Sequence, residues 1–146
     1  VVAMSTFVPE ACRSATYLSE NEIDCDIIDL RSISPMDWDT IYDSVKKTGR
    51  LLVLDTGSAS HSVAAEIVAK VSMECWTSLK CAPHRIAMPD IPVPTSFALT
   101  KGLYPGMEEI VLTACKMVNR KLNVNNQCSE HTEFHDIPGA WFNGPF

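Results

Sequence analysis

The chain has 146 residues, of which 46% are hydrophobic and 21% are charged, as is typical of a soluble globular protein with one substantial core. The formal net charge is −6, and the clustered basic residues form only short pairs such as Lys46-Lys47 and Arg120-Lys121, which argues against a nucleic-acid-binding surface. No apolar run has the length of a membrane span, and no signal peptide is recognisable.

The first part of the chain predicts a strand, a helix and a second strand. Val1–Thr6 has the composition of a buried strand, and because the chain would enter a sheet at once, we expect the natural polypeptide to extend upstream. Pro9 suits the start of a helix that continues to about Ser19 and ends near Asn21. Asp24–Arg31 is apolar on both faces, which predicts a central parallel strand.

A second helix is predicted from the run Ser34-Pro35-Met36-Asp37. Ser34 can cap the helix, Pro35 suits its first position, and Asp37 occupies the acidic position of a capping box. Gly49 is suited to end this helix, because glycine adopts the left-handed conformation found after helix ends. The residues expected to face inward are Trp38, Ile41 and Val45.

The second part of the chain continues the alternation. Leu51–Leu54 predicts a buried strand, Asp55–Ser60 a turn, and His61 to about Trp76 a helix. Cys81–Met88 predicts a short strand, and Met107–Val118 a last helix.

Strands that alternate with helices predict an α/β fold: a three-layer α/β/α open sheet of about five mostly parallel strands. Pro89–Pro94 cannot be a central strand, because its prolines lack the N–H groups that a strand ladder needs. We expect one domain over 1–118 and an extended tail over 119–146, whose aromatic residues pack on the domain or on a partner.

Six cysteines could form three disulfides, but a chain of this length can build a core without them. We expect free core thiols instead, with Cys12, Cys75 and Cys115 on helices. No C-x-x-C pair occurs, and between His131 and His135 the glutamate of a zinc-protease motif is absent, so no metal site is expected.

The run Asp55-Thr56-Gly57 matches the aspartic-protease signature. That chemistry needs two carboxylates side by side, so a single copy would have to form a dimer, and the helical residues that follow fit it badly. The turn also precedes a helix amino terminus, where anions can bind, but it lacks the lysine of a phosphate-binding loop. A plain turn is the favoured interpretation.

His61 is placed at the start of the predicted helix, where the dipole favours a neutral imidazole. It could act as a hydrogen-bond donor or a general base at a domain interface, although an exposed or capping histidine is the more common case. Asp55 and His61 are therefore the two catalytic candidates among the residues.

Three groups of residues occur in an order that identifies a family. Ile27-Ile28-Asp29-Leu30-Arg31 precedes Ser34-Pro35-Met36-Asp37; Leu51–Asp55 precedes Ala65-Glu66-Ile67; and Ala82-Pro83 and Arg85-Ile86 precede Asp90-Ile91-Pro92-Val93-Pro94. Together they resemble the C-terminal domain of transketolase-like thiamine diphosphate enzymes, with the closest likeness to the β subunit of 2-oxoacid dehydrogenase E1 components. Ser60-His61-Ser62 departs from the pattern, since glycines are frequent there in the family.

The resemblance implies an assembly and interface domain without catalytic, cofactor-binding or metal-binding residues of its own. The whole enzyme would decarboxylate a 2-oxoacid or cleave a ketol, using thiamine diphosphate and Mg²⁺ held by other domains, whose G-D-G…N motif is absent here. A free-standing interaction module without catalysis is the alternative.

The implied partners are other domains or subunits of the same enzyme in a homo- or hetero-oligomer, with docking of an acyltransferase as a further role. No nucleic acid and no membrane are expected, and the implied location is the cytoplasm or the mitochondrial matrix. The residues expected at the interface are Asp90, Pro92, Pro94, Trp141 and Phe146.

Overall fold

The computed structural model describes residues 1–100 and 103–122, and it confirms the predicted alternation of strands and helices. In chain order the elements are β1 (Val2–Ala3), α1 (Phe7–Glu20), β2 (Ile28–Asp29), α2 (Trp38–Thr48), β3 (Leu52–Ser58), α3 (Val63–Glu74), the 3-10 helix η1 (Trp76–Ser78), β4 (His84–Met88), α4 (Phe97–Thr100) and α5 (Met107–Met117).

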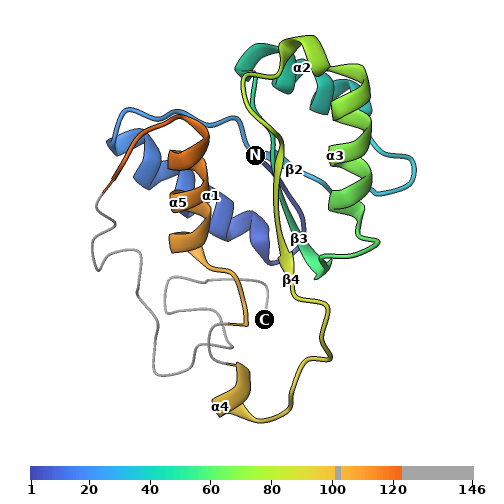
Figure 1. Cartoon of the computed structure of the whole chain (residues 1–146), viewed down its shortest axis with the longest axis vertical. Helices are drawn as coiled ribbons and strands as arrows, with labels where there is room; N and C mark the ends of the chain where they lie inside the picture. The colour runs from blue at the N-terminus through green and yellow to red at the C-terminus, as the bar shows by residue number, and fades with distance from the viewer. Residues whose placement is uncertain (101–102, 123–146) are drawn as a thin grey trace.

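The strands form one parallel sheet in the order β2-β1-β3-β4. Helices α1 and α5 lie on one side of this sheet, and α2 and α3 lie on the other (Figure 1). The three-layer α/β/α class is therefore confirmed, with four strands in the described part of the chain where about five were predicted. No described helix is long and apolar enough to cross a membrane.

The strand predicted over Asp24–Arg31 is at the edge of the sheet and not at its centre, and its regular part is only Ile28–Asp29. The strand is apolar on both faces because the helical layers on the two sides of the sheet both extend as far as this edge strand. Ile27 packs against the cluster on the α1 side, and Ile28 packs against the cluster on the α2 side. A strand can thus be apolar on both faces without a neighbour on each side.

Helix α2 begins later than predicted. Asp37 is its N-cap and accepts a hydrogen bond from the Thr40 N–H at 3.1 Å, whereas Ser34 lies outside the helix, before a cis bond to Pro35. The acidic side chain takes the capping role, because it can accept N–H groups that the first helical turn leaves unpaired. The end of the helix is as predicted, since Gly49 has a φ of 74°.

Strand β3 continues through the residues predicted to form a turn. Asp55 pairs with Ala87 and Ser58 with Met88, with a register shift between the two pairs. Pairing with β4 keeps this segment extended, so the loop to α3 is short. Ser62 is the N-cap of α3, which places His61 before the helix.

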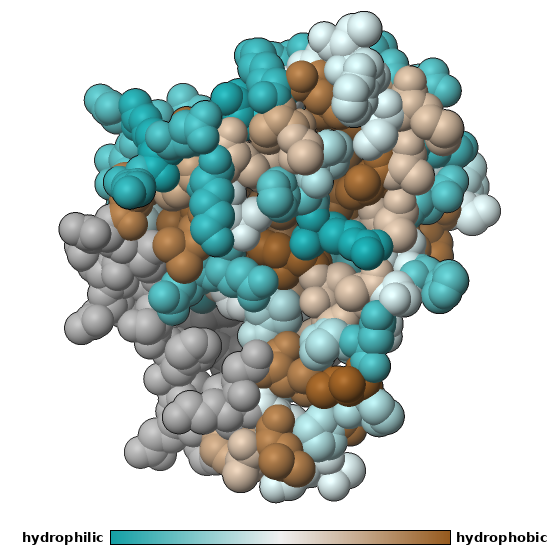
Figure 2. Space-filling view, in the orientation of Figure 1, coloured by the Kyte–Doolittle hydropathy of each residue, from teal (hydrophilic) through white to brown (hydrophobic). Residues whose placement is uncertain are grey.

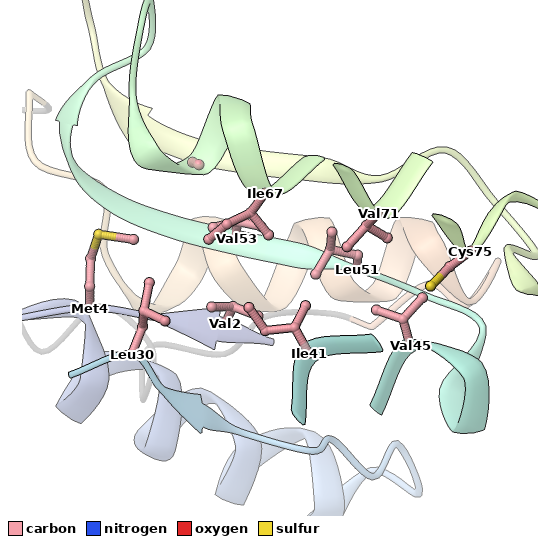
Figure 3. Packing of buried hydrophobic residues seen from close by; sticks show 11 residues of the cluster. Val2, Met4, Leu30, Ile41, Val45, Leu51, Val53, Ile67, Val71 and Cys75 are labelled. Carbon is pink, nitrogen blue, oxygen red and sulfur yellow. The ribbon is translucent and has the colours of Figure 1, made fainter. Parts of the chain in front are cut away.

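The core between the sheet and helices α2 and α3 is formed by the inward residues of both layers (Figure 3). Ile67 and Val71 of α3 are fully buried there, against Leu51 and Val53 of the β3 region. A second cluster joins the sheet to α1 and α5, and a third joins these two helices to each other. Of the residues predicted to face inward on α2, Ile41 and Val45 are buried in the first of these clusters and Trp38 packs partly buried against it.

The described cysteines are free, as predicted. Cys75 and Cys115 are buried in the core, but Cys12 is exposed, so its prediction as a core thiol is wrong. Cys12 follows the buried Ala11 on α1 and thus points to the solvent side, because successive helical residues are 100° apart. Cys128 lies outside the described residues.

Candidate functional site

The carboxyl ends of β3 and β4 bring together two loops that carry the three ionisable residues predicted for the site. The first, 55–62, comprises the end of β3 and the loop to α3 and contains Asp55 and His61, and the second, 89–94, contains Asp90. We call these two loops the rim. Binding residues of open α/β sheets commonly lie at the carboxyl ends of the strands, so the rim is the first place to look for function.

Asp55 holds the inside of the rim together. Its side chain is buried, with 4% of the residue exposed. One carboxylate oxygen accepts the Gly57 N–H at 2.8 Å, and the other accepts the Ala64 N–H at the start of α3, also at 2.8 Å. In the described part of the chain no hydrogen bond joins Asp55 to a second carboxyl group. Its contacts are those of a residue that shapes a loop, and they offer no support for the aspartic-protease alternative.

Asp90 joins the two loops of the rim. Its carboxylate accepts the Ser60 hydroxyl at 2.6 Å and the Ser60 N–H at 2.8 Å. Next to this pair, the Ala59 N–H donates to the Met88 carbonyl at 2.7 Å. The hydroxyl of Ser60, then its N–H, and the positive charges of Arg85 and His61 lower the pKa of Asp90. The carboxylate is therefore ionised at neutral pH, and charged acceptors form the stronger kind of hydrogen bond.

His61 is exposed and stands at the tip of the first loop with a φ of 55°, in the left-handed region. Its predicted place inside a helix is wrong, because Ser62 caps α3 one residue later and accepts the Ala65 N–H at 3.2 Å. The structure thus brings His61 to the same surface as Asp90. Asp55 is turned away from that surface into the protein.

The rim continues into an apolar surface that the sequence analysis did not single out. Ile91 and Val93 are 56% and 55% exposed, and farther along, Phe97 and Leu99 of α4 are 45% and 68% exposed. Figure 2 shows hydrophobic residues gathered at this end of the molecule. The sequence already indicated this exposed apolar surface, because large apolar residues alternate with prolines in a segment that cannot enter the sheet.

The predicted interface residues fall in two places. Pro92 and Pro94 both lie on the rim with Asp90, and Pro92 is exposed whereas Pro94 is half-buried. Trp141 and Phe146 lie outside the described residues, as do His131 and His135. No group of three metal-ligating side chains is present in residues 1–100 and 103–122.

A separate open hollow of about 430 Å³ lies beside the edge strand β2. Ile28, Pro35 and Thr40 are among its lining residues, and the ion pair between Arg31 and Asp29, at 2.8 Å, borders it. None of the predicted site residues lines this hollow.

Comparison with known proteins identifies relatives of this domain. Residues 1–110 match the family model described as transketolase, C-terminal domain. The chain is 34% identical over 116 residues to the beta subunit of acetoin:2,6-dichlorophenolindophenol oxidoreductase of Cupriavidus necator, covering 80% of this chain and 34% of that protein. It is 40% identical over 111 residues to the mitochondrial pyruvate dehydrogenase E1 component subunit beta-1 of Arabidopsis thaliana, covering 76% of this chain and 31% of that protein.

A solved structure described as a split-gene transketolase, an inactive beta4 tetramer, has the same fold, with a TM-score of 0.68. It is 19% identical in sequence, and the match covers 83% of this chain and 39% of that chain. The chain described here spans about a third of the length of the curated relatives that it matches.

Proposed function

The chain belongs to the transketolase C-terminal domain family, and we propose on this basis that it is the assembly and interface domain of a thiamine diphosphate-dependent enzyme. The whole enzyme would be an E1 β-like or transketolase-like protein that decarboxylates a 2-oxoacid or cleaves a ketol. The observation that carries this proposal is the family match over residues 1–110, together with relatives about three times as long.

We propose that the rim and the apolar residues beside it contact another domain or subunit. Contiguous exposed apolar residues are common at protein–protein interfaces and uncommon elsewhere. Ile91 and Val93 each have about half of their surface still to bury, which would stabilise a complex by roughly 1 kcal/mol per side chain. The prolines on either side restrict the backbone, so less conformational entropy is lost when a partner binds.

The cofactor, in this proposal, is held outside this domain. The chain contains no G-D-G…N motif for a diphosphate and its metal. The described rim residues do not fit that group either, because Asp55 already accepts two backbone N–H groups and Asp90 is bound to Ser60. Thiamine diphosphate would supply the reactive carbon of the whole enzyme, and this chain would supply contacts between subunits.

The finer predictions about partners stay as predictions. Docking of an acyltransferase would involve Phe146, so a chain shortened to residues 1–122 should bind that partner less tightly. An unchanged affinity would remove the tail from the proposal. We also propose a location in the cytoplasm or the mitochondrial matrix, in line with relatives from bacteria and from plant mitochondria.

A domain exchange tests the proposed function. The aligned 111 residues of the Arabidopsis E1 beta-1 subunit would be replaced by the corresponding residues of this chain, and the chimera would be expressed with the other subunits of that E1 component. We expect the chimera to assemble and to retain pyruvate dehydrogenase activity within about tenfold, which is about 1.4 kcal/mol in the barrier. A folded chimera that stays separate from the other subunits would favour the free-standing interaction module.

The same chimera tests the place of the interface. Replacing Ile91 and Val93 by aspartate should abolish assembly, because two charges would have to be buried without partners. Met73→Asp is the matched control, since Met73 is also apolar and is 71% exposed, but lies on α3 away from the rim. Equal loss of assembly in both variants would contradict the assignment of the interface to the rim.

A further inference from the structure

The second loop of the rim is tied to the rest of the protein by very few hydrogen bonds. Within the described part of the chain, the hydrogen bonds that connect residues 89–94 with another segment all come from the pair Ser60–Asp90. The other hydrogen bond of residues 89–94 is local, from the Ile91 N–H to the Pro89 carbonyl. The direction in which 89–94 leaves β4 therefore depends on one carboxylate.

Both oxygens of Asp90 are used in this pair, and they take different donors of the same residue. One accepts the N–H and the other accepts the hydroxyl of Ser60. A two-point contact restricts rotation of the carboxylate as well as its distance, so it sets the angle between the two loops. On either side of Ser60, the Gly57 and Ala64 N–H groups donate to the Asp55 carboxylate, which shapes the first loop from inside.

We infer that Ser60 and Asp90 are positioning residues, which hold the 89–94 loop in the shape that another subunit of the enzyme binds. This inference rests on the proposed interface function and adds to it the pair of residues on which the interface depends. In the absence of the pair, Ile91 and Val93 would remain exposed and apolar but would occupy many orientations. Their ordering would then oppose binding, because fixing a mobile backbone costs conformational entropy.

The ionisation of Asp90 supports this role at the pH of a cell. Its pKa is lowered by the hydrogen bonds from Ser60 and by nearby positive charge from Arg85 and His61. A carboxyl group with a lowered pKa contributes its stabilisation above its ordinary pKa of 3.8 and loses it only as the pH falls through the lowered value. The contact is therefore fully formed at neutral pH.

The test uses Asp90→Ala and Ser60→Ala, and the chain provides a matched control. Asp37 is also an exposed aspartate whose carboxylate accepts the N–H and the hydroxyl of one residue, Thr40, at 3.1 and 2.6 Å. Asp37→Ala removes an equal charge and a matching pair of hydrogen bonds at the start of α2, the helix that follows β2 at the opposite edge of the sheet from β4. Each variant would be made in the full chain and in the chimera described above.

Two measurements are needed, one on each protein. In the full chain, hydrogen exchange of the Ser60 amide should become roughly tenfold faster in Asp90→Ala, as expected for the loss of a hydrogen bond to a charged group, and should stay unchanged in Asp37→Ala. In the chimera, Asp90→Ala and Ser60→Ala should each weaken assembly at least tenfold. Asp37→Ala should leave assembly as it is.

The outcomes separate the two proposals. A chimera with unchanged rim residues that does not assemble contradicts the proposed function itself. A chimera that assembles equally well with and without Asp90 overturns the positioning role alone. Weakening of the same size in Asp37→Ala would also overturn it, because the effect would then reflect a general loss of stability.

Discussion

Carboxylates hold separate stretches of backbone together in this domain, and among the described residues Asp55 is the buried example. We expect Asp55→Asn to lower the free energy of unfolding by about 1–3 kcal/mol, because the amide NH₂ would face a backbone N–H that now has no acceptor. Urea unfolding followed by circular dichroism would measure the change. Asp43→Asn is the control, because 81% of the Asp43 side chain is exposed, and it should change the free energy of unfolding by less than about 0.5 kcal/mol. Equal effects would contradict the structural role of Asp55.

The buried carboxylate also explains why a four-residue motif was a poor guide to function. Asp55-Thr56-Gly57-Ser58 has the letters of a protease signature, but all four residues lie in β3, which pairs with β4, and the aspartate accepts a hydrogen bond from the start of α3. What the motif needs is a second carboxylate in hydrogen-bonding distance. A short sequence motif does not show whether a second carboxylate lies close enough, because that residue would come from elsewhere in the chain.

Among the elements, the end of α2 depends on one glycine. Gly49 has a φ of 74°, and a methyl group there would lie 2.8 Å from the side chain of Lys80. We expect Gly49→Ala to destabilise the protein by about 1–2 kcal/mol, because a left-handed conformation is costly for any residue with a Cβ atom. Thermal unfolding would measure the loss.

A second variant separates the two causes. In a Lys80→Ala background, the collision is removed but the backbone strain at Gly49 remains. Most of the destabilisation should therefore persist, since the Lys80 side chain is flexible and exposed and can move aside. A Gly49→Ala change that became harmless in this background would show that the contact, and not the backbone conformation, controls the position.

At the scale of the whole molecule, the exposed rim leads to a prediction about the cofactor. We expect calorimetric titration of the chain with thiamine diphosphate and Mg²⁺ to show no saturable binding, because the rim carboxylates are already engaged by protein donors. The chimera with the Arabidopsis subunit provides the positive control and should bind the cofactor. Saturable binding of one cofactor by the isolated chain would contradict the proposed division between this domain and the rest of the enzyme.

Patterns that are local in the sequence were sufficient to predict most elements of this fold. The apolar run Leu51–Leu54, the helical periodicity of α3 and α5, and the glycine after α2 all act within a few residues, so they can be recognised without a structure. The family resemblance can also be recognised without a structure, because its short motifs follow one another in a fixed order along the chain. Asp90, Pro92 and Pro94 were predicted at an interface on that resemblance, and this assignment stays a prediction.

Contacts between distant residues decided the rest. The edge position of β2 depends on which strand pairs with β1, and the extension of β3 past Leu54 depends on pairing with β4. The pair Ser60–Asp90 joins residues 30 positions apart, and neither residue carries a local signal for the other. Hydrogen bonding between separate strands and loops is not encoded in short windows of sequence, so only the folded chain determines which loops form the rim and which carboxylate is hidden beneath it.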